Sequence, residues 1–376
     1  MRGDTNETGI RRFFWVDALR GVAALVIVVF HYHHFYLADA YDRPAVPDIS
    51  TFPYANLLTP LYSSFAANAV ELFWLISGFV FLHVYLRRET GVWPFAVARF
   101  ARLYPLHFAT LLYVAALQVV SMQVAGHWQI YDNNDVRHFI LQLFMASNWN
   151  NLAHGLSFNG PIWSVSLEIV VYGMFFCAIP LLKKAPIATS AVLSVLAWSW
   201  IGFHPFAVPF VSMGVFECAA YFFVGSLLYA LRPYAFLSRA MGLAVAGVAL
   251  FVVGKVVGFD DLLIIGTAIA LVSLAAALDA IAPDKGKWLS PLGDISYSVY
   301  LVHVPLQMTI LLVADMFFDG TRDFANSTLT LPVYLAVSIA VALFVHRWLE
   351  LPLGKRSKQL LLPDNKPSQQ SNMHQK

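Results

Sequence analysis

Charged side chains are scarce in this chain. Asp, Glu, Lys and Arg make up 12% of its 376 residues, about half the share of an ordinary soluble domain. Hydrophobic residues make up 59%, and the mean hydropathy is +0.64. The net charge of +2 gives no reason to expect nucleic acid as a partner. The composition predicts an all-α protein, a polytopic helix bundle surrounded by membrane lipid.

Several familiar catalytic signatures are also missing. The chain has no Gly-rich phosphate loop, no H-E-x-x-H pair, no G-x-S-x-G nucleophile elbow and no internal repeat. Its two cysteines, Cys177 and Cys218, fall within hydrophobic stretches and are predicted to be small core residues, neither a disulfide nor a metal site. No metal is expected, and the lack of a small-residue cleavage site argues against a cleaved signal peptide.

Long hydrophobic stretches dominate what is present. A helix that crosses a membrane needs ~20 apolar residues, and ten stretches qualify: 16–37, 68–86, 104–124, 162–182, 187–203, 213–231, 240–257, 262–282, 295–317 and 329–349. The fifth is short and could be broken near His204 and Pro205, so nine or eleven spans remain open. Residues 1–355 are predicted to form one integral membrane domain and residues 356–376 a disordered cytoplasmic tail.

Lys and Arg gather in the connections on one side of these spans, the side that holds the N-terminus. The opposite side holds only Arg43, Arg137 and Arg322, with Lys255 near the outer end of a span. Because cytoplasmic loops are enriched in Lys and Arg, both termini are predicted to be cytoplasmic. The expected location is the inner or plasma membrane of the cell, crossed many times.

Arg20 and His31 lie within the first predicted span. Eleven helical residues add up to three full turns plus about 20°, so the two side chains share one face, ~16 Å apart along the axis, and His33 points away. Asp17 is placed to pair with Arg20 or to cap the helix start. Arg20 alone could be a cation that reaches for the interface, and His31 alone a packed histidine. Their shared face favours a functional site, because ionisable groups within a bilayer are costly.

Three further segments contain residues capable of chemistry. Ser77 and Gly78 lie in a hydrophobic helix, where they favour the close approach of another helix, or of an acyl chain, over catalysis. Arg99 and Arg102 share one helical face ahead of the third span; a positive-inside loop explains their charge, and their spacing also suits phosphate groups. Glu168 enters the fourth span about one turn deep, where a carboxylate needs water, a partner or a catalytic role.

The ninth predicted span presents a polar stripe. Ser296, Tyr300 and His303 are four and three residues apart and therefore share one helical face. By itself this stripe would be a buried polar network between helices. Together with the other segments, it is predicted to be a wall of the same cavity.

Taken in order, these segments resemble the acyltransferase 3 family, integral membrane acyltransferases of polysaccharide, lipopolysaccharide, Nod-factor and macrolide modification. The family's elements are matched by Arg20 and His31 (Arg, ten residues, His), residues 77–79 (S-G-F), Arg99 to Pro105 (R-x-x-R-[IL]-x-P), Trp163, Ser164 and Glu168 (W-S-[LV]-x-x-E), residues 295–305 (I-S-Y-x-[LV]-Y-L-x-H-x-P), and Glu350 and Pro352 (E-x-P). Val22, Phe100 and Ala101 depart from the common pattern without removing any of these groups.

The resemblance implies transfer of a short acyl group, acetyl or else succinyl, from cytoplasmic acyl-CoA to a hydroxyl of an exopolysaccharide, O-antigen or lipo-oligosaccharide. In that reaction His31 would be the base or an acylated nucleophile, Arg20 would hold the donor or steady the oxyanion, and Glu168 would orient His31 or the sugar. Arg99 and Arg102 would bind the phosphates of acyl-CoA. The remaining cavity wall would include Asp17, Ser77, Trp163, Ser164, Tyr300 and His303.

Two other functions stay open. A macrolide-type small molecule could replace the glycan or glycolipid as acceptor. A polytopic glycan transporter or flippase, or a subunit of a polysaccharide assembly complex, would also place charges at the membrane midplane. A transporter would be expected to show duplicated halves with broken helices in matching positions, and the sequence shows no such duplication.

The shared face of Arg20 and His31 gives a first prediction. Substituting His31→Ala should abolish acyl transfer by the purified protein while expression and membrane insertion stay normal, because the base on that face is removed. His33→Ala should be tolerated far better. Equal losses in the two variants would contradict the shared-face argument.

Overall fold

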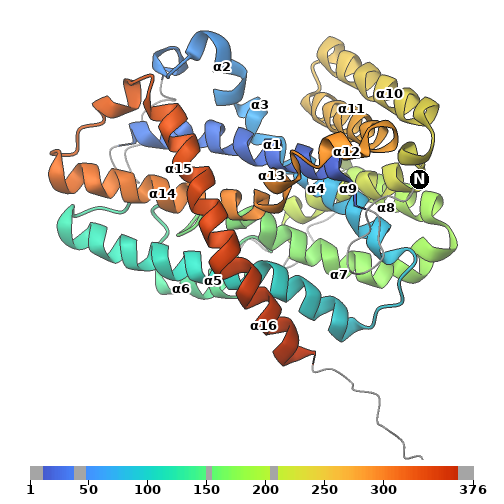
Figure 1. Cartoon of the computed structure of the whole chain (residues 1–376), viewed down its shortest axis with the longest axis horizontal. Coiled ribbons are helices and arrows are strands. Elements are labelled where there is room, and N and C mark those ends of the chain that lie inside the picture. The colour runs from blue at the N-terminus through green and yellow to red at the C-terminus, as the bar shows by residue number, and fades with distance from the viewer. Residues whose placement is uncertain (1–11, 38–47, 150–154, 204–210, 363–376) are drawn as a thin grey trace, which may run out of the picture.

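The computed structural model describes residues 12–37, 48–149, 155–203 and 211–362 (Figure 1). Within these residues the chain is helical and contains no strand. Ten of its helical segments are long and apolar enough to cross a membrane: Phe14–Tyr36, Phe65–Tyr85, Val92–Val124, Ile162–Lys184, Pro186–Phe203, Met213–Ala235, Leu237–Val257, Asp260–Ile281, Ser296–Phe317 and Thr330–Leu361. The ten predicted spans are confirmed, and the break suggested at His204 and Pro205 lies outside the described residues.

The helices within these segments have the following bounds: α1 (Phe14–Phe30), α4 (Ala69–Tyr85), α5 (Val92–Val124), α7 (Ile162–Lys184), α8 (Pro186–Phe203), α9 (Met213–Ala230), α10 (Leu237–Val257), α11 (Asp260–Ile281), α14 (Ser296–Phe317), α15 (Thr330–Val345) and α16 (Leu351–Leu361). Short helices lie between them: α2 (Ala55–Tyr62), α3 (Ser64–Ala67), α6 (Val136–Leu143), α12 (Pro283–Gly286) and α13 (Ser290–Asp294). In Figure 1, α15 and α16 run obliquely across α14 and α5.

The start of α1 is fixed by a carboxylate from another helix. Asp279, near the end of α11, is 1% exposed and accepts hydrogen bonds from the backbone N–H groups of Trp15 (3.1 Å) and Val16 (3.2 Å). The Trp15 indole also donates to the carbonyl oxygen of Ala282 (2.9 Å). The first N–H groups of a helix have no partner within it and are costly to bury unpaired. Asp279 therefore locks α1 against the end of α11.

Glycines bring α4 and α9 into backbone contact. A Cβ added at Gly78 would collide with the carbonyl oxygen of Phe222, and one added at Gly225 would collide with that of Leu75. Helices in membranes associate through such close packing, since lipid is as apolar as their side chains. The helix approach predicted for Ser77 and Gly78 is confirmed, and its partner is α9.

The first span changes its helix type at His31. The α-helix ends at Phe30, and residues His31–Tyr36 form a 3₁₀-helix. Because a 3₁₀-helix has three residues per turn, side chains are redirected relative to a continuous α-helix. His33, predicted to point away from the functional face, stacks on His31 with ring centroids 6.0 Å apart.

Two other elements continue further than the hydrophobic pattern indicates. Helix α5 begins at Val92 and has 33 residues, a length of ~50 Å, so Arg99 and Arg102 lie on a helix. Helix α16 follows a π-helical turn, His346–Glu350, and ends at Leu361. Residues 363–376 of the predicted tail lie outside the described residues.

The sidedness of the bundle leads to a second prediction. Val136 (76% exposed) and Asp284 (side chain 87% exposed) lie in connections on opposite sides of the predicted topology. In a Cys177→Ala background, a cysteine at Val136 should react with an impermeant thiol reagent in intact cells. A cysteine at Asp284 should react only after permeabilisation. Labelling of both in intact cells would contradict the cytoplasmic placement of the termini.

Candidate active site

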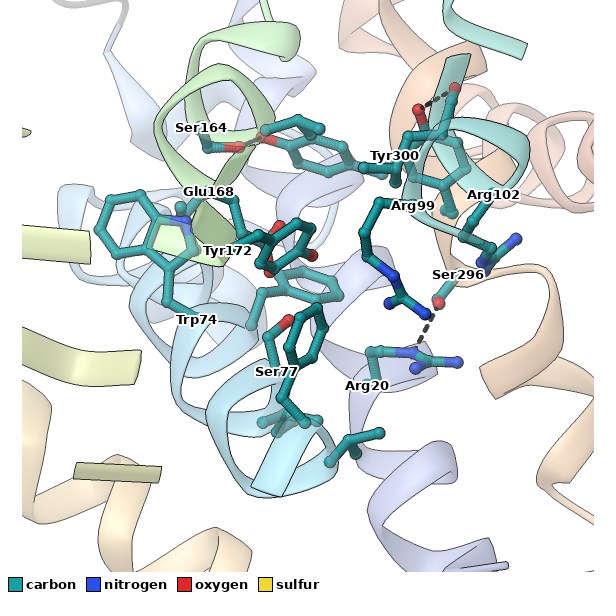
Figure 2. Close-up of a pocket in the computed structure, with 18 residues that line it drawn as sticks. Arg20, Trp74, Ser77, Arg99, Arg102, Ser164, Glu168, Tyr172, Ser296 and Tyr300 are labelled. Atoms are coloured by element: carbon teal, nitrogen blue, oxygen red, sulfur yellow. Dashed lines mark hydrogen bonds between the residues drawn. The ribbon is translucent and has the colours of Figure 1, made fainter. Parts of the chain in front are cut away.

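A cavity with both polar and apolar side chains on its wall lies where α1, α4, α5, α7 and α14 meet (Figure 2). Its volume is about 150 Å³. The polar side chains on its wall are Arg20, Ser77, Arg99, Arg102, Ser164, Glu168, Tyr172, Ser296, Tyr297 and Tyr300. Figure 2 shows the arginines of α1 and α5 on one side and Glu168 with Tyr172 on the other. Residues separated by up to 280 positions in the sequence thus face one space.

Arg20 is held by the end of α13 and the start of α14. Its Nε donates to the hydroxyl of Ser296 (3.0 Å), and its Nη2 donates to the carbonyl oxygen of Gly293 (2.8 Å). A Cβ at Gly293 would lie 2.4 Å from the carbonyl oxygen of Asp17, so glycine allows α13 to approach α1. Arg20 is therefore rigidly placed, and it remains 26% exposed at the cavity.

Asp17 lies beside this arginine but does not line the cavity. Its carboxylate is 3.6 Å from Arg20 Nη2 and accepts from Arg12 Nε (2.6 Å). Arg12 also donates to Asp294 (2.5 Å). Asp17 thus links the start of α1 to the end of α13 in a chain of alternating charges.

Arg102 is paired with a buried carboxylate. Glu350, 4% exposed, forms an ion pair with Arg102 and accepts from the Ser298 hydroxyl (2.5 Å). His346 Nδ1 lies 2.9 Å from the same carboxylate. The guanidinium of Arg102 also lies over the ring of Tyr297, 5.3 Å from its centroid. The π-helical turn therefore attaches the end of α15 to α5 and α14.

Arg99 is held mainly by aromatic rings. Its guanidinium lies 4.8 Å from the ring centroid of Phe81 and 6.0 Å from those of Tyr85 and Tyr172. A cation over an aromatic face is attracted by the ring quadrupole. Its Nε is buried and has no hydrogen-bond partner among the described residues. Arg99 is thus a positioned cation with a hydrogen-bond donor still unused.

The rest of the wall presents one carboxylate and four hydroxyl groups. Glu168 Oε1 is buried and has no hydrogen-bond partner among the described residues, and the hydroxyls of Ser77 and Tyr172 lie close to this carboxylate. Ser164 Oγ lies 2.8 Å from the Tyr300 hydroxyl, which also donates to the carbonyl oxygen of Pro161 (3.0 Å). Glu168 can therefore accept a further hydrogen bond from a group in the cavity.

His31 lies outside the wall of this cavity, in a cluster of histidines just beyond the end of α1. Its Nδ1 lies 2.9 Å from the carbonyl oxygen of Ile27 and 3.3 Å from Nε2 of His303. A carbonyl oxygen only accepts, so Nδ1 holds the proton and His31 Nε2 keeps a lone pair. His303 Nδ1 in turn faces the carbonyl oxygen of Val299 (3.3 Å), which leaves its Nε2 as an acceptor.

Gln307 fixes the remaining part of this cluster. Its amide nitrogen donates to the carbonyl oxygen of His31 (2.8 Å), and its amide oxygen lies 3.0 Å from Nδ1 of His34. Tyr300 connects the cluster to the cavity, because its ring lines the cavity and lies 5.9 Å from the ring of His303. Arg20 and His31 thus both contact α14, at Ser296 and His303 respectively.

Sequence reasoning missed three residues at this site. Tyr172 lies one helical turn after Glu168, a spacing that could have placed it on the same face. Tyr297 is the first tyrosine of the matched element at residues 295–305, but it was given no role. Glu350 belonged to the matched E-x-P element but had no assigned partner. Trp163 does not line the cavity; it packs edge-on against Trp74, with ring centroids 5.8 Å apart.

With this geometry established, comparison with known proteins identifies the family. Residues 13–347 match the sequence profile of a family described as an acyltransferase domain. The chain belongs to the acyltransferase 3 family. It is therefore a multi-pass membrane acyltransferase that uses an acyl donor. No solved structure matches the chain.

Two relatives show partial similarity to this family member. "Protein 2 in picA locus" of Rhizobium radiobacter is 32% identical over 177 residues, which is 44% of this chain and 81% of the relative. "Acyltransferase MdmB" of Streptomyces mycarofaciens is 32% identical over 124 residues, which is 32% of this chain and 30% of the relative. The chain thus matches less than a third of the second relative's length.

The unpaired carboxylate oxygen in the cavity gives a third prediction. Glu168→Gln keeps the side-chain shape but removes the charge and one acceptor, so kcat for acyl transfer should fall roughly 100-fold or more, as for loss of a positioned acid–base group. Thermal stability in detergent should change little. Glu168→Asp, which restores the charge on a shorter stem, should recover part of the rate. Full activity of Glu168→Gln would show that this carboxylate has no role in transfer.

Proposed function

We propose that this acyltransferase moves a short acyl group, acetyl or else succinyl, from cytoplasmic acyl-CoA to a hydroxyl of a cell-surface or exported glycan. The observation that supports this best is the set of three guanidinium groups, Arg20, Arg99 and Arg102, on the wall of one cavity inside a membrane bundle. Acyl-CoA carries a diphosphate and a further phosphate, and guanidinium groups pair with phosphate through several hydrogen bonds.

The positions of these groups suggest how the donor lies. Arg99 is seven residues from the first residue of α5, ~10 Å along its axis, so phosphates bound there stay near that end of the bundle. The pantetheine arm is long and flexible. It would bring the thioester past Arg20 and along α1 towards the histidine cluster.

The chemistry requires one base and one site for negative charge. The acceptor oxygen attacks the thioester carbonyl, the C–S bond breaks, and CoA leaves as a thiol after taking up a proton. His31 Nε2 has the lone pair to accept the acceptor's proton and later to return it to sulfur. With His31 as the base, the oxyanion forms beside the histidine cluster, ~16 Å along the axis from Arg20. Arg20, held by Ser296 and Gly293, would therefore hold the pantetheine arm of the donor. Glu168 would orient the sugar from the facing wall.

Transfer of label tests the function directly. Purified protein in liposomes receives acetyl-CoA with a radiolabelled acetyl group and a glycan extracted from the producing cell. Label should appear on the glycan as an alkali-labile ester. If a macrolide-type small molecule is labelled and the glycan is not, the small molecule is the acceptor. Glycan movement across the membrane without any transfer of label would support a transporter.

The arginines give a fourth prediction, which concerns donor affinity. Arg99→Ala removes a cation without leaving a carboxylate unpaired, and affinity for acetyl-CoA should fall roughly 10- to 150-fold, the cost of one charge-assisted contact. Affinity for the acceptor should be unaffected.

Arg102→Ala should weaken acetyl-CoA binding too, but it also leaves Glu350 buried without its ion pair. Arg102→Ala therefore needs Arg102→Ala/Glu350→Ala as its matched control. Unchanged acetyl-CoA binding in detergent by the Arg99→Ala/Arg102→Ala protein would mean that these arginines only set the topology.

A further inference from the structure

The C-terminal helix α16 runs antiparallel along the first half of α5. A Cβ at Gly354 would lie 2.7 Å from the carbonyl oxygen of Ala101, so the two backbones are in close contact there. Seven residues later, the carbonyl oxygen of Leu361 accepts a hydrogen bond from the indole of Trp93 (2.9 Å). The two contacts fix both the direction and the register of α16 against the segment that carries the donor-site arginines.

This register places Lys358 beside those arginines. Gly354, Lys358 and Leu361 are spaced by four and three residues, so they share the face of α16 that meets α5. Between Gly354, at the level of Ala101, and Leu361, at the level of Trp93, Lys358 falls near the level of residue 97. Its charge lies within electrostatic range of Arg88, Arg99 and Arg102.

The positive charges gathered here exceed the carboxylates that pair with them. Glu350 pairs with Arg102, and Glu89, beside Arg88 in sequence, pairs with Lys183 (2.6 Å). Among the described residues, no carboxylate forms an ion pair with Arg99 or Lys358. Like charges held together raise the energy of the empty protein and favour an anion that binds between them.

The two unpaired cations differ in depth. Arg99 is half-buried among aromatic rings at the cavity wall, whereas Lys358 is exposed and does not line the cavity. A coenzyme A donor that enters thioester first leaves its nucleotide end at this outer level. Its diphosphate lies between the pantetheine and the ribose, and a separate phosphate is attached to the ribose 3′ oxygen.

We infer that Lys358 binds the 3′-phosphate of the acyl-CoA donor, while Arg99 and Arg102 hold its diphosphate. This inference rests on the proposed function. It assigns to α16 a role in donor recognition: the helix places a cation at the outer end of the site and makes the enzyme select acyl-CoA over its 3′-dephospho form.

A comparison of two donors tests the inference. Equilibrium binding of acetyl-CoA and of 3′-dephospho-acetyl-CoA is measured for the full chain in detergent. The wild type should bind acetyl-CoA roughly 2- to 5-fold more tightly, as expected for one exposed charge-assisted contact. Lys358→Gln should bind both donors alike, with its affinity for the dephospho form unchanged. Lys358→Arg should restore the preference.

The matched control is Arg356→Gln. Arg356 lies two residues from Lys358, on the opposite face of α16, and should keep the wild-type preference. The inference would be overturned if Lys358→Gln kept the full preference for acetyl-CoA over its 3′-dephospho form, or if the wild type showed no such preference. Either result would leave the binding of the donor itself intact. Failure of the wild type to bind either donor would instead overturn the proposed function.

A second arm separates the donor phosphate from a lipid phosphate. The same measurements are made in nanodiscs of phosphatidylcholine alone and with phosphatidylglycerol. The donor preference, and its loss in Lys358→Gln, should be the same in both. If Lys358→Gln alters donor binding only where phosphatidylglycerol is present, Lys358 binds a lipid headgroup and the inference is wrong.

Discussion

The cost of placing guanidinium groups inside a membrane bundle governs this structure. Each such group must find partners within the protein, because lipid offers none. The chain meets this requirement in three different ways. Arg20 uses a carbonyl group of α13 and a hydroxyl group at the start of α14, Arg102 uses the buried Glu350, and Arg99 rests on aromatic rings. Helices far apart in sequence are joined as a result.

The need to pair these arginines explains the unusual geometry of α13 and of the π-helical turn before α16. Arg20 can reach a backbone carbonyl of α13 only because Gly293 lets that short helix touch α1. Glu350 reaches Arg102 from the end of a π-helical turn, a local change of helix type that is often found at functional sites. Glycine contacts between α4 and α9 hold Ser77 at the cavity wall from behind. The close packing of the helices therefore also determines where the charged side chains lie.

The cavity arginines and the histidine cluster perform separate tasks in the proposed reaction. The arginines at the cavity suit the anionic end of a donor, whereas the histidine cluster provides an uncharged base with its proton fixed on Nδ1 of His31. Tyr300 and His303 on α14 bridge the two regions. Such separation suits a donor with phosphates at one end and a thioester at the other.

The sequence alone determined the membrane class, the ten spans and the family, because hydropathy over ~20 residues and ordered motifs are local signals. It also brought Arg20, Ser77, Arg99, Glu168 and Tyr300 into one expected cavity. Only the tertiary structure showed that Arg102 is paired with Glu350 and that His31 lies in a cluster beyond the cavity wall. A partner some 250 residues away leaves no trace in local periodicity. Likewise, the 3₁₀-helix that begins at His31 is contacted by Gln307 of α14, a partner distant in sequence.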